Sequence, residues 1–363
     1  MSETDAETVV VTGASAGVGR ATAREFGKRG ARVGLLARGD DGLDGAKREI
    51  EAAGGEALAI PTDVSEFEQV EAAAERVEEE FGPIDVWVNC AMTSVFSEVA
   101  DMEPSEYRRV TEVTYLGYVH GTLAALDSMR PRDEGSIVQV GSALAYRGIP
   151  LQSAYCASKH AMKGFTESLF AELDRDDSDV SVSMVHLPGL NTPQFTWVKT
   201  RLPNEPKPVE PVYQPEVAAD AVAWAARNDR RELYVGRPTV KTILGEKFVP
   251  RLLDRFLART GYDSQQADEP VDPDREHNLW EPVGEDRGAR GPYDERAKTS
   301  SPQLWLATHR KVVGGVVGLL AILAGRLFFG GEAGAEDRSD RETGDPDRPA
   351  RQVAAEARRA GER

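Results

Sequence analysis

The sequence predicts an α/β fold, in which a doubly wound and mostly parallel sheet is covered by helices on both faces. Short apolar runs alternate with helix-like stretches from residue 8 to about residue 236, and the connections between them are short. Repeated strand–helix–strand units of this kind build parallel sheets. The strand-like runs are almost continuously apolar, as expected for strands that are buried on both faces.

The pattern begins with three expected strands and the two helices between them. TVVVTG at residues 8–13 is a β-branched run that predicts a strand, and a glycine-rich turn leads from it into a helix at residues 19–30. ARVGLLAR at residues 31–38 predicts the second strand. GLDGAKREIEAAGG at residues 42–55 predicts a helix that ends at glycine. EALAIPTDV at residues 56–64 predicts the third strand.

The alternation continues through the middle of the chain. SEFEQVEAAAERVEEEFG at residues 65–82 predicts a helix that begins at Ser65, and IDVWVN at residues 84–89 predicts the fourth strand. A long helix is expected at residues 105–129. The remaining expected elements are a strand at residues 135–142, a helix that contains residues 153–165 and a strand at residues 180–189.

The sequence changes in character after about residue 250. Residues 261 to 303 are rich in Asp, Glu, Pro and Gly and show no hydrophobic period, so we expect an irregular segment that Trp280 and Tyr293 attach to the globular body. The last thirty or so residues are charged and poor in apolar groups. We therefore expect an α/β domain at residues 1–250, an irregular polar extension at 251–305, a hydrophobic helix at 306–330 and a disordered tail at 331–363.

The apolar run at residues 312–330 predicts membrane association, because it is close to the ~20 residues that a helix needs to span a bilayer. Arg326 lies near one end, where its side chain can reach the interface. Arg310 and Lys311 flank the other end and favour a cytoplasmic globular body. A soluble helix buried in a dimer is the alternative. The acidic N-terminus, MSETDAET, does not resemble a signal peptide, which also favours the cytoplasm.

Composition excludes several classes of function. The net charge of −17 and the pI of about 4.9 disfavour nucleic-acid binding, because such a surface repels phosphate backbones. Two cysteines give no disulfide framework, and both are expected to be buried and reduced: Cys90 and Cys156. No metal site is expected, since CxxC and HExxH are absent and the histidines have no ligand spacing.

A glycine-rich turn follows the first expected strand and contains Gly13, Gly17 and Gly19. Glycine lets the backbone approach a pyrophosphate closely, and the helix that follows presents free N–H groups and a positive dipole to it. Glycines also serve ordinary tight turns. The position between a strand and a helix, at the start of a βαβ series, favours dinucleotide binding.

Tyr155 and Lys159 lie four residues apart in an expected helix, so both project from the same face. A neighbouring ammonium favours the phenolate, and we therefore expect Lys159 to lower the pKa of Tyr155. Such a pair serves as a proton donor and acceptor near neutral pH. Pairs with this spacing also occur by chance on surface helices.

TGxxxGxG followed by YxxxK resembles the short-chain dehydrogenase/reductase family, and the resemblance covers roughly residues 6 to 240. It implies a Rossmann-fold, dinucleotide-binding and catalytic domain at residues 1–250, and a homo-oligomer. Ser142, thirteen residues before Tyr155, corresponds to the family's catalytic serine. By the same resemblance Asp63 holds the adenine ring, Asn89 begins the turn after the fourth strand, and the LPGLNTP segment meets the nicotinamide carboxamide. The candidate cofactor-binding residues are Gly13, Ser15, Gly17, Val18, Gly19, Arg38, Asp63, Val64, Asn89, Tyr155, Lys159, Pro188, Gly189 and Thr192.

Two positions depart from the family pattern. Thr114 stands where an asparagine is expected to help hold a water that links the lysine to bulk solvent. The backbone carbonyl takes part in that relay, so Thr114 is kept as a candidate catalytic residue. Cys90-Ala91-Met92 replaces the usual Asn-Ala-Gly and puts a bulkier side chain beside the cofactor.

The end of the second strand favours NADP(H) over NAD(H). Ala37 stands where NAD enzymes carry an acid for the ribose hydroxyls, and Arg38 follows immediately. Loss of the carboxylate and gain of a guanidinium suit a 2′-phosphate, to which Ser15 can add a hydrogen bond. The alternative for Arg38 is a solvated loop residue.

These features predict an oxidoreductase that reduces a ketone or aldehyde to an alcohol, or catalyses the reverse. Tyr155 is expected to act as general acid and base, Lys159 to lower its pKa and Ser142 to polarise the carbonyl. Two alternatives are a catalytically weak NADP(H)-binding sensor or scaffold, suggested by Thr114 and Met92, and a membrane-tethered structural protein. The segment after Thr192 is expected to shape the substrate pocket, with three aromatic residues as an apolar wall or as core anchors: Phe195, Trp197 and Tyr213.

Overall fold

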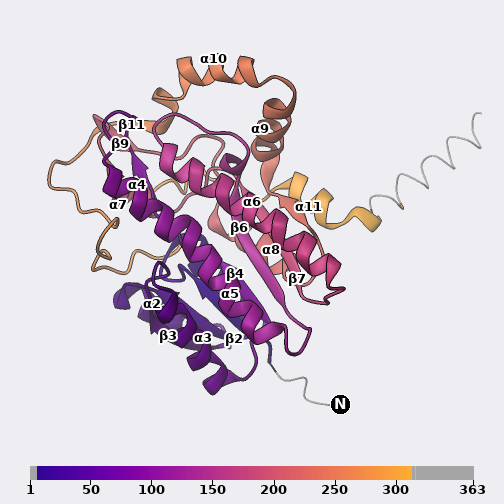
Figure 1. Ribbon diagram of the computed structural model, residues 1–363. Coiled ribbons are helices and arrows are strands. Elements are labelled where there is room, and N and C mark those ends of the chain that lie inside the picture. The colour runs from indigo at the N-terminus through magenta and orange to yellow at the C-terminus, as the bar shows by residue number, and fades with distance from the viewer. Residues whose placement is uncertain (1–5, 313–314, 316–363) are drawn as a thin grey trace, which may run out of the picture. The chain divides into compact units, whose positions relative to one another are not determined.

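The computed structural model describes residues 6–312 and residue 315. The described residues up to residue 309 form one compact unit. This unit is built on a sheet of seven parallel strands in the order β10-β7-β6-β4-β1-β2-β3, which confirms the predicted fold class (Figure 1). The strands are β1 (Thr8–Thr12), β2 (Arg32–Ala37), β3 (Glu56–Pro61), β4 (Val86–Asn89), β6 (Ser136–Ser142), β7 (Ser181–Leu187) and β10 (Glu232–Tyr234).

Alternate residues of the central strand β1 explain why both faces of the sheet carry helices. Val9 and Val11 belong to one apolar cluster and Val10 to another, because successive side chains of a strand point to opposite faces. The first cluster includes residues of α1 (Gly17–Gly27), α2 (Asp40–Ala52) and α8 (Pro215–Ala225). The second includes residues of α3 (Phe67–Phe81), α5 (Gly117–Met129) and α6 (Ser153–Arg175).

The long helix that we predicted at residues 105–129 has three parts. It begins as α4 (Pro104–Thr111), widens into a π-helical turn η1 (Glu112–Leu116) and continues as α5. Glu103 and Glu106 form a capping box at its start. Single π-helical turns are frequent at functional sites, and this one carries Thr114.

The predicted irregular extension begins with regular structure. A helical hairpin is formed by α9 (Gly236–Phe248) and α10 (Pro250–Thr260), and β11 (Gln266–Pro270) pairs antiparallel with β9 (Asn204–Pro206). Other short elements are the β5 (Val95–Phe96) and β8 (Lys199–Thr200) pair, α7 (Gln194–Trp197), the 3₁₀ turns η2 (Ala143–Ala145) and η3 (Asp263–Gln265), and α11 (Pro302–Thr308).

Residues 271–301 lie between β11 and α11 and contain no helix or strand, as predicted for this stretch; we call them the strap. Tyr293 attaches the strap to the body as expected, since its ring meets that of Phe195 at 6.1 Å between centroids. Trp280 is 42% exposed and attaches the strap through its backbone carbonyl, which accepts a hydrogen bond from Arg38 at 2.7 Å. Its neighbour Leu279 is fully buried instead.

Most of the predicted membrane anchor lies outside the described residues, which end at residue 312 apart from residue 315. The same holds for the predicted tail at residues 331–363. Of the predicted hydrophobic helix at 306–330, the structure describes the end of α11 and the residues from 309 to 312, with residue 315. Within the described part of the chain, no helix is both long enough and apolar enough to cross a bilayer.

Candidate active site

A cavity of about 860 Å³ opens at the carboxyl ends of β1, β2, β4, β6 and β7. This is where doubly wound α/β proteins bind their ligands, because the loops after the strands meet there. The structure brings almost all of the predicted site residues together in its wall: Gly13, Ser15, Gly17, Val18, Gly19, Arg38, Asp63, Val64, Ser142, Tyr155, Lys159, Pro188, Gly189 and Thr192.

The loop between β1 and α1 leaves no room for a Cβ at two of its glycines. A Cβ on Gly13 would lie 2.8 Å from the Cα of Ala91, and one on Gly19 would lie 2.2 Å from the carbonyl oxygen of Gly13. Gly13 and Gly17 also have φ values of +69° and +57°, which favour glycine. The loop therefore packs as closely as the sequence predicted, and it leads directly into the N-terminus of α1.

Arg38 follows β2 and lies beside a second cation, Arg109. Its guanidinium donates hydrogen bonds to the carbonyl oxygens of Asn278 (2.5 Å) and Trp280 (2.7 Å). Among the described residues, Arg38 forms no ion pair with a carboxylate. Burial lowers the pKa of Arg38, and the positive charge of Arg109 lowers it further. An anion at this position would relieve that repulsion.

Asp63 lines the same end of the cavity, and its carboxylate is already engaged. Arg109 donates to it at 2.5 Å, and the hydroxyl of Ser65 donates at 2.8 Å. Burial alone would raise the pKa of Asp63, but these hydrogen bonds hold it below its usual value. The carboxylate therefore stays ionised beside Arg109, and sequence reasoning did not identify this partner.

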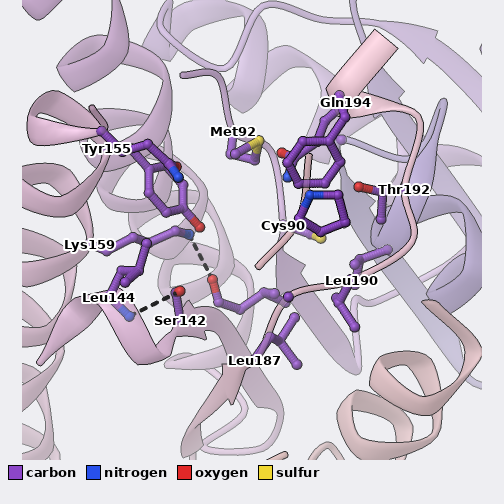
Figure 2. Close-up of a pocket in the computed structure, with 18 of the residues that line it drawn as sticks. Cys90, Met92, Ser142, Leu144, Tyr155, Lys159, Leu187, Leu190, Thr192 and Gln194 are labelled. Atoms are coloured by element: carbon purple, nitrogen blue, oxygen red, sulfur yellow. Dashed lines mark hydrogen bonds between the residues drawn. The ribbon is translucent and has the colours of Figure 1, made fainter. Parts of the chain in front are cut away.

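Tyr155, Lys159 and Ser142 lie together on one side of the cavity, opposite Cys90, Met92 and Thr192 (Figure 2). The side chain of Ser142 is close enough to that of Tyr155 to favour the ionised phenol. The hydroxyl of Ser142 also accepts a hydrogen bond from the backbone N–H of Leu144 at 3.1 Å. A tyrosine on a helix and a serine at the end of a strand thus point at one place, where a small polar group would meet both hydroxyls.

Lys159 is 2% exposed and is surrounded by polar groups close to Tyr155. Its ammonium donates to the hydroxyl of Tyr118 and to the carbonyl of Val140, both at 2.8 Å. Tyr118 in turn donates to Val140 at 2.9 Å. Tyr118 was not identified from the sequence, since no motif marks a residue of the preceding helix that reaches across to α6.

The predicted lowering of the pKa of Tyr155 by Lys159 is wrong for the protein alone. Burial raises the pKa of Tyr155, and the neighbouring hydroxyl of Ser142 opposes that effect only in part. The ammonium lies 5.7 Å from the centre of the Tyr155 ring. Burial also lowers the pKa of Lys159 to about 7, so its positive charge is lost well before the phenol ionises.

The arrangement of these residues agrees with the predicted resemblance, and a comparison of the sequence with known families tests it. The pattern that defines the short chain dehydrogenases matches residues 7–201, more than half of the chain. The chain belongs to the short-chain dehydrogenase family. This is a family of oxidoreductase enzymes, and the predicted resemblance is confirmed.

Relatives of this dehydrogenase include an uncharacterized oxidoreductase and reductases that are named for their substrates. An uncharacterized oxidoreductase of Bacillus subtilis, YxnA, is 33% identical over 277 residues, which are 76% of this chain and 78% of the relative. The 3-ketodihydrosphingosine reductase of Bos taurus is 36% identical over 207 residues, 56% of this chain and 60% of the relative. A metagenomic short-chain oxidoreductase solved with NADP has a TM-score of 0.53 at 31% identity, with 63% of this chain and 96% of that chain covered.

Two predicted site residues of the dehydrogenase do not reach the cavity. Asn89 is fully buried, and its amide donates to Thr122 (3.2 Å) and to Gln139 (3.1 Å) inside the sheet. The cavity is lined instead by the three residues that follow it, Cys90, Ala91 and Met92. Asn89 therefore supports the loop that lines the cofactor cleft without lining it.

Thr114 is the second of these residues. It is fully buried, its hydroxyl donates to the carbonyl of Thr93 at 2.9 Å, and it accepts from the N–H of Thr93 at 3.0 Å. Both interactions hold the chain just after Met92. The side chain of Thr114 thus fixes this loop and is not free to bind a water for a proton relay.

Apolar side chains from several elements contribute to the cavity wall, together with polar ones. Phe195 and Trp197 line the cavity, which supports the predicted apolar wall, whereas Tyr213 belongs to the core of the sheet. The helical hairpin α9–α10 contributes further apolar lining that the sequence did not reveal: Leu253, Phe256 and Leu257. Arg147 pairs with Glu246 of α9 at 2.8 Å and with Asp254 of α10, which holds the hairpin beside the cavity.

The buried ammonium of Lys159 makes stability depend on pH in a predictable direction. Its pKa is about 7 in the folded dehydrogenase, whereas a lysine in an unfolded chain titrates near ~10.4. Between these values the unfolded chain binds more protons, so the free energy of unfolding rises with pH. We expect urea unfolding of the wild type to gain more stability between about pH 7 and 9 than that of Lys159→Met. Equal slopes for the two proteins would contradict the buried ammonium.

Proposed function

We propose that this dehydrogenase uses NADP(H) to reduce a ketone or aldehyde to an alcohol. The observation that carries the proposal is the placement of Tyr155, Ser142 and the buried Lys159 on one side of the cavity that also contains the glycine loop and Arg38. The residues fit the cofactor, because the glycine loop leads directly into the N-terminus of α1 and Arg38 has no carboxylate partner among the described residues. Solved relatives that contain NADP support the same choice.

Each residue of the site has a role that follows from its surroundings. When bound, NADPH supplies the hydride. The hydroxyl of Tyr155 gives its proton to the substrate oxygen, and its raised pKa keeps that proton in place until charge develops there. The hydroxyl of Ser142 donates a hydrogen bond to the same oxygen and stabilises the negative charge of the transition state.

Lys159 restores the proton to Tyr155 after reaction. Its pKa of about 7 makes the ammonium a ready proton donor at neutral pH. Tyr118 and Val140 hold it beside the tyrosine and satisfy two of its three donor positions.

The apolar side chains in the cavity wall support a substrate with a hydrocarbon chain. Phe195, Trp197, Leu253 and Leu257 line the cavity, and burying each CH₂ group contributes about 0.8 kcal/mol. Relatives named for ketoacyl and 3-ketodihydrosphingosine reduction support a chain-bearing ketone. We therefore expect the carbonyl at Tyr155 and the chain directed towards the α9–α10 hairpin.

NADPH consumption with methyl ketones of increasing chain length tests both the carbonyl reduction and the preference for a hydrocarbon chain. We expect kcat/KM to rise about fourfold for each added methylene until the pocket is filled. A preference for short polar ketones would reject the substrate class and leave carbonyl reduction standing. Tight NADPH binding with no turnover on any ketone or aldehyde would favour the alternative of a sensor, for which the bulky Met92 in the cavity wall is the supporting feature.

A further inference from the structure

The strap runs along the whole length of the predicted cofactor cleft. In Figure 1 it is the coil that leaves β11, passes α7 and reaches towards α2 before it returns to α11. Five of its residues line the cavity that holds the glycine loop: Asn278, Pro282, Val283, Glu285 and Arg287. Nothing in the alternating strands and helices of the family's fold requires such a segment, so its contacts with the cleft need their own explanation.

One end of the strap is fixed at the adenosine side of the cleft. The carbonyl oxygens of Asn278 and Trp280 accept the two hydrogen bonds of Arg38. The carbonyl of Leu279, between them, accepts from Arg109 at 3.2 Å. The side chain of Leu279 is fully buried in an apolar cluster, so this end is anchored by packing as well as by hydrogen bonds.

The middle of the strap lies against the glycine loop and α1. The carbonyl of Gly288 accepts a hydrogen bond from the backbone N–H of Gly17 at 3.2 Å. Asp286 forms an ion pair with Arg20, whose side chain is 3% exposed. These contacts place the strap directly beside the N–H groups at the start of α1.

The far end of the strap is fixed next to the loop that follows β7. The N–H of Gly291 donates to the carbonyl of Asn191 at 3.2 Å, and the N–H of Tyr293 donates to the side-chain oxygen of Asn191 at 2.9 Å. Asp294 accepts hydrogen bonds from Asn191 and from Gln214, both at 2.9 Å. The strap is therefore held at both ends of the cleft and crosses it between them.

Arg287 is the cation of the strap that faces the cavity. Its guanidinium lies 6.0 Å from the centre of the Trp197 ring and pairs with Glu285 at 3.0 Å. Glu285 is 69% exposed, so this pair is weak and readily exchanged. The Nε of Arg287 is buried and has no hydrogen-bond partner. A buried donor without a partner is costly, and a guanidinium suits a phosphate that would satisfy it.

We propose that the strap forms the outer wall of the cofactor site and that Arg287 binds the pyrophosphate of the dinucleotide, opposite the N–H groups of the glycine loop. The inference rests on the proposed function, because it requires NADP(H) in this cleft. A wall fixed at both ends predicts that the nucleotide leaves only when the strap moves, and so dissociates slowly.

The test measures nucleotide binding to the full chain rather than turnover. Dissociation constants for NADPH and for adenosine 2′-monophosphate, which lacks the pyrophosphate, are obtained by fluorescence titration and calorimetry. The variants are Arg287→Gln, Arg287→Lys and the matched control Arg296→Gln, which removes a charge from the strap at a side chain that is 66% exposed and outside the cavity lining. Melting curves without nucleotide check that all variants fold.

We expect Arg287→Gln to weaken NADPH about 10- to 100-fold and to speed its release, and to change the affinity for adenosine 2′-monophosphate less than twofold. Arg287→Lys should retain part of the affinity, and Arg296→Gln should match the wild type. Unchanged NADPH binding in Arg287→Gln, or equal loss for both ligands, would overturn the role of Arg287 while NADPH binding by the wild type still supports the proposed function. Failure of the wild type to bind NADPH would overturn both.

Discussion

Replacing Tyr155 by phenylalanine should lower carbonyl reduction by about 10²- to 10⁴-fold, the usual contribution of a positioned general acid. The hydroxyl of Tyr155 is the proton donor that the site offers beside Ser142, and phenylalanine keeps the ring while removing the proton. The dissociation constant for NADPH should stay within about twofold, because the glycine loop and Arg38 are untouched. Steady-state kinetics with a ketone substrate, together with NADPH titration, measure the two quantities separately.

Tyr107→Phe is the matched control for this substitution. The hydroxyl of Tyr107 is hydrogen-bonded to Ser153 at 2.7 Å, and Tyr107 does not line the cavity. It should therefore lose a hydroxyl without losing turnover. Wild-type rates in Tyr155→Phe would remove Tyr155 from the chemistry, and parallel losses in both variants would point to a general effect on α6.

The fold was predictable because its signals are local and repeated. The apolar runs are continuous because the strands are buried on both faces. Successive valines of β1 point to opposite faces and pack in two different clusters. The glycines of the first loop were predictable for a similar reason. Gly13 and Gly19 stand where the backbone leaves no space for a Cβ, so the sequence carries the mark of the geometry.

The positions of Asn89 and Thr114 were not predictable from motif alignment. Asn89 ends β4, and whether its amide turns into the sheet or out to the cleft depends on Gln139 and Thr122, which lie 50 and 33 residues away in sequence. Thr114 bonds to Thr93 because a π-helical turn rotates the helix locally. Contacts at these separations leave no signal in the spacing of either residue.

The predicted lowering of the pKa of Tyr155 was wrong for a different reason. A spacing of four residues places Lys159 on the same helix face, and that part of the argument holds. The spacing does not say how deeply the pair is buried. In the folded protein burial acts on both groups, so it raises the pKa of the phenol and lowers that of the ammonium.

The irregular course of the strap was predicted, but its contacts with the cleft were not, because most of them are polar. Its carbonyl groups bind Arg38 and Arg109, and Asp286 binds Arg20, so few apolar residues mark it in the sequence. Its apolar contacts come from Leu279, Ala289 and Tyr293, which are too far apart in sequence to give a hydrophobic period. A polar stretch without periodicity can therefore form an ordered segment when arginine side chains of the body donate hydrogen bonds to its backbone carbonyls.

The cofactor choice has the second large expected effect. Arg38→Asp should weaken NADPH at least about 100-fold, because it removes a guanidinium that donates charge-assisted hydrogen bonds and puts a carboxylate in its place. Binding of NADH should change much less. Arg38 also holds the strap carbonyls of Asn278 and Trp280, and losing those contacts affects both nucleotides alike. The ratio of the two dissociation constants therefore isolates the 2′-phosphate.

Arg38→Gln separates charge from hydrogen bonding in the same experiment. Glutamine can still donate to one strap carbonyl, but it cannot neutralise a phosphate, so the NADPH to NADH preference should fall while the strap stays in place. Limited proteolysis of the strap reports the second property independently. Equal losses of NADPH and NADH affinity in Arg38→Asp would mean that Arg38 serves the strap alone, and the preference for NADP(H) would then have to come from elsewhere, with Ser15 of the glycine loop as the nearest candidate.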